Sequence, residues 1–165
     1  MEELRLPRSP KEGIIFGTVV AAISCAIIGG INIYLAVGAD EFPRAFVTSY
    51  LIVFLFAFVL SNFIVEGIAR SIVGRILSPG DSVNAIICFN LIVFVLIMSA
   101  TMSLLGPLAG QISGCIFYGG SMDVIHILDN WQYIWPRNFC IAFWVEMLIA
   151  QPVGRRVMIW MHTRA

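Results

Sequence analysis

The stretch IAFWVEMLIAQPVGRR, residues 141–156, places one acidic side chain in the middle of an apolar run. This residue, Glu146, lies nine positions before Arg155, which corresponds to roughly 13 Å along an α-helix. If the stretch crosses a bilayer, the carboxylate lies near the midplane, where its ionised form costs at least ~2.5 kcal/mol. We therefore expect Glu146 to face protein or water, or to bind a proton.

The helical face around Glu146 is polar or small, and such a face is expected to contact other helices. It comprises the residues four and eight positions away, namely Asn138, Ala142, Ala150 and Gly154. One interpretation is that Glu146 binds a cation or cycles a proton during transport. The other is that it forms a protonated or hydrogen-bonded contact between helices, with Asn62, Asn90 or Asn32 as its partner. We favour the second, because intramembrane polar side chains often hold helices together.

Other polar residues have a structural explanation. Glu66 precedes Arg70 by four positions, the favourable order for a helical ion pair near a membrane interface. Asp123, His126 and Asp129 recur every three residues, but a metal site needs three or four ligands with supporting contacts, which the sequence does not offer here. We therefore expect no metal site.

Motifs of familiar enzyme classes are missing from the sequence. No GxSxG, HExxH, P-loop or glycine-rich dinucleotide motif stands in a suitable context. The four cysteines fit neither a zinc spacing nor a CxxC redox motif, and we do not expect Cys115 and Cys140 to form a disulfide. The sequence predicts no catalytic residue, no cofactor and no enzyme.

The composition is that of a membrane protein. Hydrophobic residues make up 59% and charged residues 12% of the chain, against a charged fraction of about 25% in soluble domains. A transmembrane helix needs about 20 mostly apolar residues, and four segments qualify: 14–37, 45–65, 84–105 and 138–154. Little chain remains for a soluble domain, and a net charge of +0 argues against nucleic acid as a partner.

The cationic residues predict the orientation, because cytoplasmic loops carry the excess of Lys and Arg. One side of the four segments holds Arg5, Arg8, Lys11, Arg70, Arg75, Arg155, Arg156 and Arg164. The other side holds Arg44 and Arg137. We therefore expect four crossings, with both termini in the cytoplasm. Residues 108–118 are short and broken by glycines, and we expect them to be an interfacial or re-entrant piece of an external loop at about 106–136.

The chain contains a weak internal repeat. With a shift of 85 residues, the Ala-Phe pair at 57–58 aligns with the pair at 142–143. A shift of 70 residues relates the first and third segments more weakly. The sequence therefore predicts an all-α fold made of two parallel two-helix hairpins, residues 1–80 and 81–165.

Three stretches carry a resemblance to a known family: KEGIIFG at 11–17, NFIVEGIARSIVGRI at 62–76 and RNFCIAFWVEMLIAQPVGRR at 137–156. They resemble the bacterial domain-of-unknown-function family 2798, whose unit is a two-helix hairpin often found in tandem. The resemblance implies a place in the bacterial cell membrane, and it brings no established activity. Members tend to have a Gly-Pro pair near the end of each second helix, which this chain splits into Gly67 and Pro152. We expect a kink at both places.

Small residues also line the first segment at spacing four: Gly17, Ala21, Cys25 and Gly29. Such a stripe lets a neighbouring backbone approach closely. It can pack against helices of the same chain, or it can form the seam of a homo-oligomer, and the sequence leaves both open.

These features lead to two expectations for function. The first is a small integral membrane protein with a structural or accessory role, whose immediate partner is the lipid bilayer. The alternative is a small proton-coupled transporter or exporter that uses Glu146. The sequence names no substrate for it.

Overall fold

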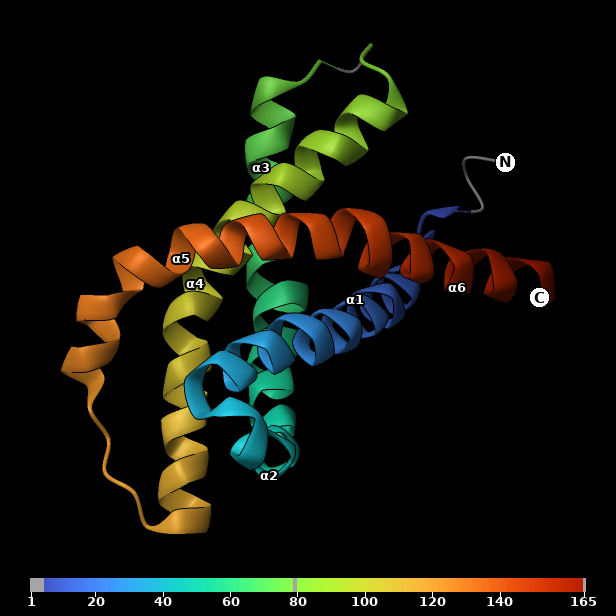
Figure 1. The fold of residues 1–165 in the computed structure, drawn as a ribbon. Helices are drawn as coiled ribbons and strands as arrows, with labels where there is room; N and C mark the ends of the chain where they lie inside the picture. Colours follow the sequence, from blue (N-terminus) through green and yellow to red (C-terminus); the bar gives the residue numbers. More distant parts are fainter. Residues whose placement is uncertain (1–4, 79, 165) are drawn as a thin grey trace.

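The computed structural model describes residues 5–78 and 80–164, and every regular element in these residues is a helix (Figure 1). The elements are α1 (Pro10–Ser24), η2 (Cys25–Gly29), α2 (Gly30–Val59), η3 (Leu60–Val65), α3 (Glu66–Ile76), α4 (Val83–Tyr118), α5 (Val124–Val145), η4 (Glu146–Ala150) and α6 (Gln151–Arg164). The three η elements are short π-helical segments, in which the helix is wider than an α-helix. The predicted all-α class is confirmed.

The elements join into three continuous helical runs, so the expectation of four separate helices is wrong. The first run bends at Gly38, whose backbone has φ 79° and ψ 179°, a conformation that residues with a Cβ rarely adopt. The bend divides that run in two. We call the four parts of the chain limb one (10–37), limb two (39–76), limb three (83–118) and limb four (124–164).

Two helices of the described residues are long and apolar enough to cross a membrane, Pro10–Ile76 and Asn84–Tyr118. Limb four is not one of them, because polar residues such as Asn138, Glu146 and Gln151 lower its hydropathy. The finding rests on length and composition, and to that extent it supports association with a membrane.

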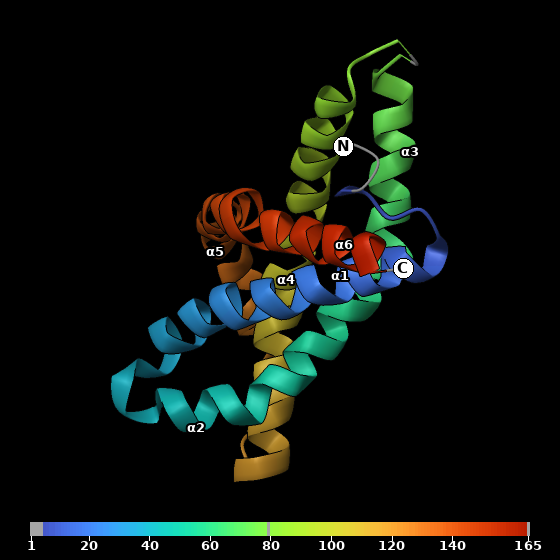
Figure 2. The same ribbon diagram turned by 90° about the vertical axis from the view of Figure 1, so that its right-hand side faces the viewer.

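The limbs form two antiparallel pairs that cross each other (Figures 1 and 2). Limb one lies beside limb four through α1 and α6, and limb two lies beside limb three through α3 and α4. The pairs also touch where α5 packs on α4. The protein is therefore not a bundle of four aligned helices, since one pair lies across the other.

Limbs two and four each bury a line of residues spaced four apart. In limb two the line is Ser49, Val53, Ala57, Ser61, Val65, Ala69 and Val73, and in limb four it is Asn138, Ala142, Glu146, Ala150, Gly154 and Met158. On a regular α-helix, positions four apart drift around the axis by about 40° per step. A π-helical segment accommodates an extra residue and so reduces that drift, and η3 and η4 lie in the middle of the two lines.

The small residues of limb one lie inside the same packing. A Cβ on Gly17 would clash with the Asn62 side chain, while Ala21 is buried and Cys25 belongs to a core cluster with Val53 and other residues. This is the packing within one chain that the sequence left open. A homo-oligomer through this stripe stays a prediction, and these side chains would have to leave their present contacts to form it.

The expected external loop at 106–136 is mostly helical, and that expectation is wrong. Limb three continues through Pro107 to Tyr118, so residues 108–118 belong to a helix and not to a loop. Packing explains why the glycines do not end the helix here: Ala109 is fully buried, and Ser113 is hydrogen-bonded to Ser49 of limb two at 3.3 Å. The chain leaves the helix at Gly119, where φ is 67°.

Limb four begins at a cap and is fastened to limb three. The Asp123 carboxylate accepts the backbone N–H of His126 at 3.0 Å, so Asp123 caps the helix. Further along, Trp131 Nε1 donates to the carbonyl oxygen of Ala100 at 2.9 Å, and Trp135 Nε1 donates to a hydroxyl of limb three. These bonds fix the first half of limb four against α4.

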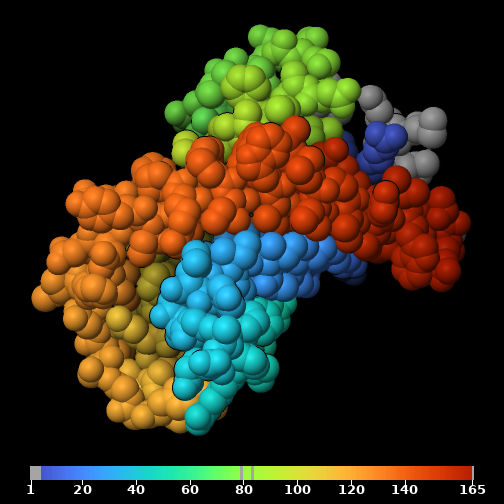
Figure 3. Space-filling view, viewed as in Figure 1, coloured from blue at the N-terminus to red at the C-terminus, as the bar shows by residue number. Residues whose placement is uncertain are grey.

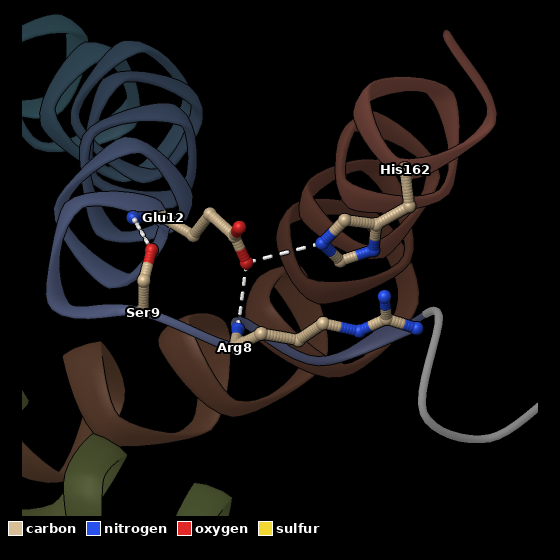
Figure 4. Close-up of polar contacts among 4 residues, drawn as sticks. All are labelled: Arg8, Ser9, Glu12 and His162. Carbon is tan, nitrogen blue, oxygen red and sulfur yellow. Dashed lines mark hydrogen bonds and ion pairs between the residues drawn. The ribbon is translucent and has the colours of Figure 1, made fainter. Parts of the chain in front are cut away.

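Limbs one and four are also tied together at their far ends (Figure 4). Glu12 Oε2 accepts the backbone N–H of Arg8 at 2.6 Å and lies 3.0 Å from His162 Nε2. The Arg8 N–H and then the His162 side chain lower the pKa of the Glu12 carboxyl below its usual value. Ser9 caps α1 by accepting the backbone N–H of Glu12. The start of the first helix is thus held on the end of the last.

Limbs one and four also approach each other closely at Gly154. A Cβ at this position would lie 2.8 Å from Phe16 Cε2 and 3.0 Å from Val20 Cγ2. Gly67 provides a contrast, because a Cβ added there would meet nothing within 4 Å. Of these two positions, only 154 requires a glycine for packing against limb one.

We predict that Gly154→Ala lowers the free energy of unfolding by about 1–3 kcal/mol, because the added methyl group displaces Phe16 and Val20. Gly67→Ala should leave it unchanged or raise it, since alanine favours a helix over glycine by up to ~1 kcal/mol. Denaturant titration of the purified protein in detergent micelles measures both. Equal stability of the two variants would contradict the close contact.

Candidate functional site

Glu146 is a buried acid at the contact between limbs one and four. It is the first residue of η4, and only 5% of its surface is exposed. Its Oε1 accepts a hydrogen bond from Ser24 Oγ at 2.5 Å. Ser24 is the last residue of α1, directly before η2. Glu146 therefore lies in one π-helical segment and Ser24 directly before another, and such segments are frequent at functional sites.

The second carboxylate oxygen of Glu146 is left without a partner. Oε2 is buried and has no hydrogen bond within the described residues. The ion pairs of that part of the chain join Arg70 to Glu66 and His162 to Glu12, and neither involves Glu146. An ionised carboxylate buried without a cation is very unfavourable. The site is therefore built for a carboxyl that holds a proton or meets a cation from outside the chain.

A large cavity lies beside Glu146. It has a volume of about 1680 Å³, and all four limbs contribute to its lining. Ser24 and Glu146 line it, and most of the remaining wall is apolar, including Leu91, Phe94 and Met98. On the outer surface, limb four and limb one run side by side, and limb three is seen recessed between limb four and the bend of the first run (Figure 3).

The three asparagines predicted to accompany Glu146 all line the same cavity. Their hydrogen bonds go elsewhere, however. Asn32 Oδ1 accepts from Arg137 Nη2 at 2.8 Å, and Asn62 Nδ2 donates to the carbonyl oxygen of Phe58 at 3.0 Å. Asn90 Oδ1 is buried and has no partner within the described residues. The structure gathers the predicted residues around one cavity without joining the asparagines to the acid.

Sequence reasoning missed Ser24, the residue that does contact Glu146. The two residues are 122 positions apart, and a serine in an apolar run carries no periodic signal that predicts a partner in another helix. The available signal was its place directly before Cys25 in the small-residue stripe, which shows that this part of limb one is packed.

Asn138 is a second buried polar residue on the face of Glu146. It lies two helical turns earlier and is 8% exposed. Its Nδ2 donates to Ser103 Oγ at 3.0 Å, whereas its Oδ1 has no partner within the described residues. Asn138 also lines the cavity. The sequence placed it beside Glu146 on the helix but did not single it out as a site residue.

The remaining predicted groups lie outside this site or have local partners. Arg70 Nε lies 2.8 Å from Glu66 Oε1 in the predicted arrangement, and the Arg70 side chain is 71% exposed, so the pair is worth little in stability. Within the described residues, no group of three or more His, Cys, Asp or Glu side chains is placed to hold a metal ion. Chemistry at the cavity therefore depends on the carboxyl and amide oxygens.

We predict that Ser24→Ala lowers the free energy of unfolding by about 1–3 kcal/mol, because it leaves Oε1 of a buried acid without a hydrogen bond. Ser61→Ala is the matched control, since Ser61 is buried but its hydroxyl donates to Phe58 of its own helix. Thermal or denaturant unfolding in micelles measures the two. A loss no larger than that of Ser61→Ala would mean that the bond to Glu146 does not hold limbs one and four together.

Comparison with known proteins identifies the first half of the chain. Residues 9–77, which cover limbs one and two, match the family described as Domain of unknown function (DUF2798). No curated protein and no solved structure matches the chain. Glu146 and the rest of limb four lie outside the matched residues. The resemblance found in the sequence is confirmed over residues 9–77, which match the DUF2798 family.

Proposed function

We propose that this chain is a multi-pass protein of the bacterial cell membrane, with four crossings and both termini in the cytoplasm. An exposed apolar stripe on limb two supports this: Val47, Leu51, Leu55, Val59 and Phe63 are between 48% and 75% exposed. A contiguous apolar surface of this kind suits lipid better than water. The excess of cations on the side of the termini favours the orientation.

The crossing of the two helix pairs is compatible with four spans. Limb one has 28 residues, from 10 to 37, and measures roughly 42 Å. The hydrocarbon layer is about 30 Å thick, so a limb of this length can cross it at a tilt. Two pairs that tilt in opposite directions would cross each other within the bilayer.

We further propose that the two halves, 1–80 and 81–165, are parallel repeats. A shift of 85 residues carries the buried line of limb two onto that of limb four, from Val53 with Asn138 to Val73 with Met158. The same shift carries η3 onto 145–150, and η4 occupies 146–150. The packing of the two halves corresponds as well. In the first contact, α1 of limb one packs on α6 of limb four, and in the equivalent contact α4 of limb three packs on α3 of limb two. A pseudo-two-fold axis would relate two such hairpins.

We predict that a cytoplasm-active reporter fused to the C-terminus is active, because an even number of crossings returns the chain to the side where it began. The same reporter inserted at residues 119–123, between limbs three and four, should be inactive. Activity of a periplasmic reporter at the C-terminus would contradict four crossings.

For the activity, we propose that Glu146 is the proton-exchanging group of a small proton-coupled transporter. One observation carries this proposal: Glu146 lines a cavity of about 1680 Å³ and has a buried carboxylate oxygen without a partner in the described residues. A residue that served only to join helices would be expected to satisfy both oxygens within the protein. A carboxylate oxygen without a partner is free to exchange a proton for a cation.

A structural or accessory role is the second candidate, and a different observation favours it. The bond from Ser24 to Glu146 joins limbs one and four directly. Under this role, Glu146→Gln should keep near wild-type stability, and Glu146→Leu should lose ~1 kcal/mol, the usual size of an intramembrane hydrogen bond. Neither variant would change a proton flux.

The transporter proposal predicts a proton flux that depends on Glu146. Vesicles containing the protein and an internal pH dye receive an acid pulse and a filtered extract of small bacterial metabolites. Wild-type vesicles should lose the pH gradient faster than empty vesicles, and Glu146→Gln should reduce the rate to that of empty vesicles. Glutamine keeps the shape and hydrogen bonding of the side chain but has no titratable proton.

Asp129→Asn is the control, because Asp129 is an exposed acid outside the cavity lining. It should behave as the wild type. An undiminished rate in folded Glu146→Gln would exclude Glu146 as the exchanging group. A wild-type rate equal to that of empty vesicles would favour the structural role instead.

A further inference from the structure

We propose that the cavity binds a lipophilic organic ammonium ion, with its charged nitrogen at Oε2 of Glu146 and its apolar body along limbs one to three. The proposal rests on the assignment of Glu146 as the exchanging group, and it adds the class of substrate. It rests on two observations: buried hydrogen-bond acceptors without partners, and the apolar side chains that line most of the cavity.

Three of the four buried side-chain atoms without a partner in the described residues are acceptors. Glu146 Oε2, Asn138 Oδ1 and Asn90 Oδ1 are all buried without a partner in the described part of the chain, and all three residues line the cavity. A buried acceptor without a partner is costly, so a ligand that supplies N–H groups gains more than one that supplies oxygens. An ammonium group offers several donors and a full charge.

One unsatisfied donor also lines the cavity, Arg155 Nε. Arg155 lies nine residues beyond Glu146 on the same limb, which is roughly 13 Å along the axis. A ligand anion placed there would be far from Glu146 and would leave its Oε2 unpaired. The arrangement at Glu146 therefore selects for a cation.

The charged and titratable groups on the elements packed against η4 leave the negative charge of Glu146 uncompensated. On α1, α4, α5 and α6 these groups are Lys11, Glu12, Cys88, Cys115, Tyr118, His126, Asp129, Tyr133, Arg137, Cys140, Arg155, Arg156, His162 and Arg164, and Cys25 lies in the adjoining η2. Among them, Cys25 is the one that interacts electrostatically with Glu146 in the described residues, and a thiol brings no positive charge. Arg137 pairs with Asn32, and Arg164 lies over the ring of Trp160.

The wall selects an organic cation over an inorganic one. Apolar and aromatic side chains line most of the cavity near the acid: Val20, Ile28, Leu91, Phe94, Met98 and Met102. A hydrated metal cation would lose its water to these groups without enough oxygen ligands in return. A hydrocarbon body gains from the same wall, and aromatic rings and thioethers are favourable neighbours for an organic cation.

Binding of the ammonium ion displaces one proton. The O–H bond of the protonated Glu146 carboxyl breaks, the proton leaves to solvent, and the carboxylate then pairs with the incoming N–H groups. The ligand brings its own positive charge, so the charge of the site is balanced before and after the exchange. Each ion bound therefore releases one proton, which is the coupling that an exchange transporter requires.

The test compares three ligands of one shape: 4-phenylbutylamine, 4-phenylbutan-1-ol and 4-phenylbutyrate. Isothermal titration of the full chain in micelles at about pH 8, where the amine is protonated, gives each affinity after subtraction of empty micelles. The amine should bind about tenfold or more tightly than the alcohol, since hydrogen bonds to a charged group are the stronger ones. Repeating the titration in buffers of different ionisation enthalpy measures the proton released.

Two variants locate the nitrogen. Glu146→Gln should reduce the affinity for the amine to that for the alcohol, while the affinity for the alcohol stays the same. Asp129→Asn should leave both affinities unchanged, because Asp129 is an exposed acid outside the cavity lining. The comparison of ligands on the wild type needs no variant, so a folding defect in either one does not remove the test.

Equal affinity for the amine and the alcohol, or tighter binding of the carboxylate, would overturn the proposal. So would full amine affinity in Glu146→Gln. The two proposals also fail separately. A proton flux that requires Glu146 without any preference for amines overturns the substrate class alone, whereas amine binding at Glu146 without a proton flux supports the substrate class and overturns the transporter.

Discussion

Close approach between helix backbones is the constraint on which the rest of this protein depends. In a membrane the hydrophobic effect does not drive helices together, so their association relies on packing and on hydrogen bonds between helices. Limbs two and four meet this need with a small or short side chain at nearly every fourth position, such as Ala57, Ala69, Ala150 and Gly154. The π-helical segments η3 and η4 lie in these lines and help to keep them on one face.

The same constraint explains where a polar site can form. A line of small residues leaves little volume at the helix contact, so a larger polar side chain on that line must find its partner at close range. Position 61 of limb two holds a serine that bonds within its own helix. The matching position of limb four, 85 residues later, holds Glu146, which reaches Ser24 on limb one. One scaffold thus carries a neutral contact in one half and an acid beside a cavity in the other.

Much of this arrangement follows from the sequence, and the failures have identifiable causes. The apolar runs predicted the all-α class, and the isolated glutamate predicted a buried acid, since Glu146 is 5% exposed. The prediction of a loop at 106–136 was wrong because it treated the glycines and Pro107 as helix breakers. Burial of Ala109 and the hydrogen bonds of Ser113 and Trp131 keep the helices intact there. The separation of limbs one and two was predicted between residues 37 and 45, and the bend at Gly38 lies there, although the chain is helical on both sides of it.

The Ser24 contact could not be predicted in this way, because it depends on which helices become neighbours, and spacing along one helix contains no such information. Its chemistry nevertheless explains how one carboxyl can hold the fold and still change its charge. Ser24 donates to Oε1, and a carboxyl group can accept a hydrogen bond there whether it is ionised or protonated. The contact between limbs one and four therefore persists through either state. The other oxygen, Oε2, is left to meet a proton or a cation, so orientation and exchange are assigned to different atoms of the same side chain.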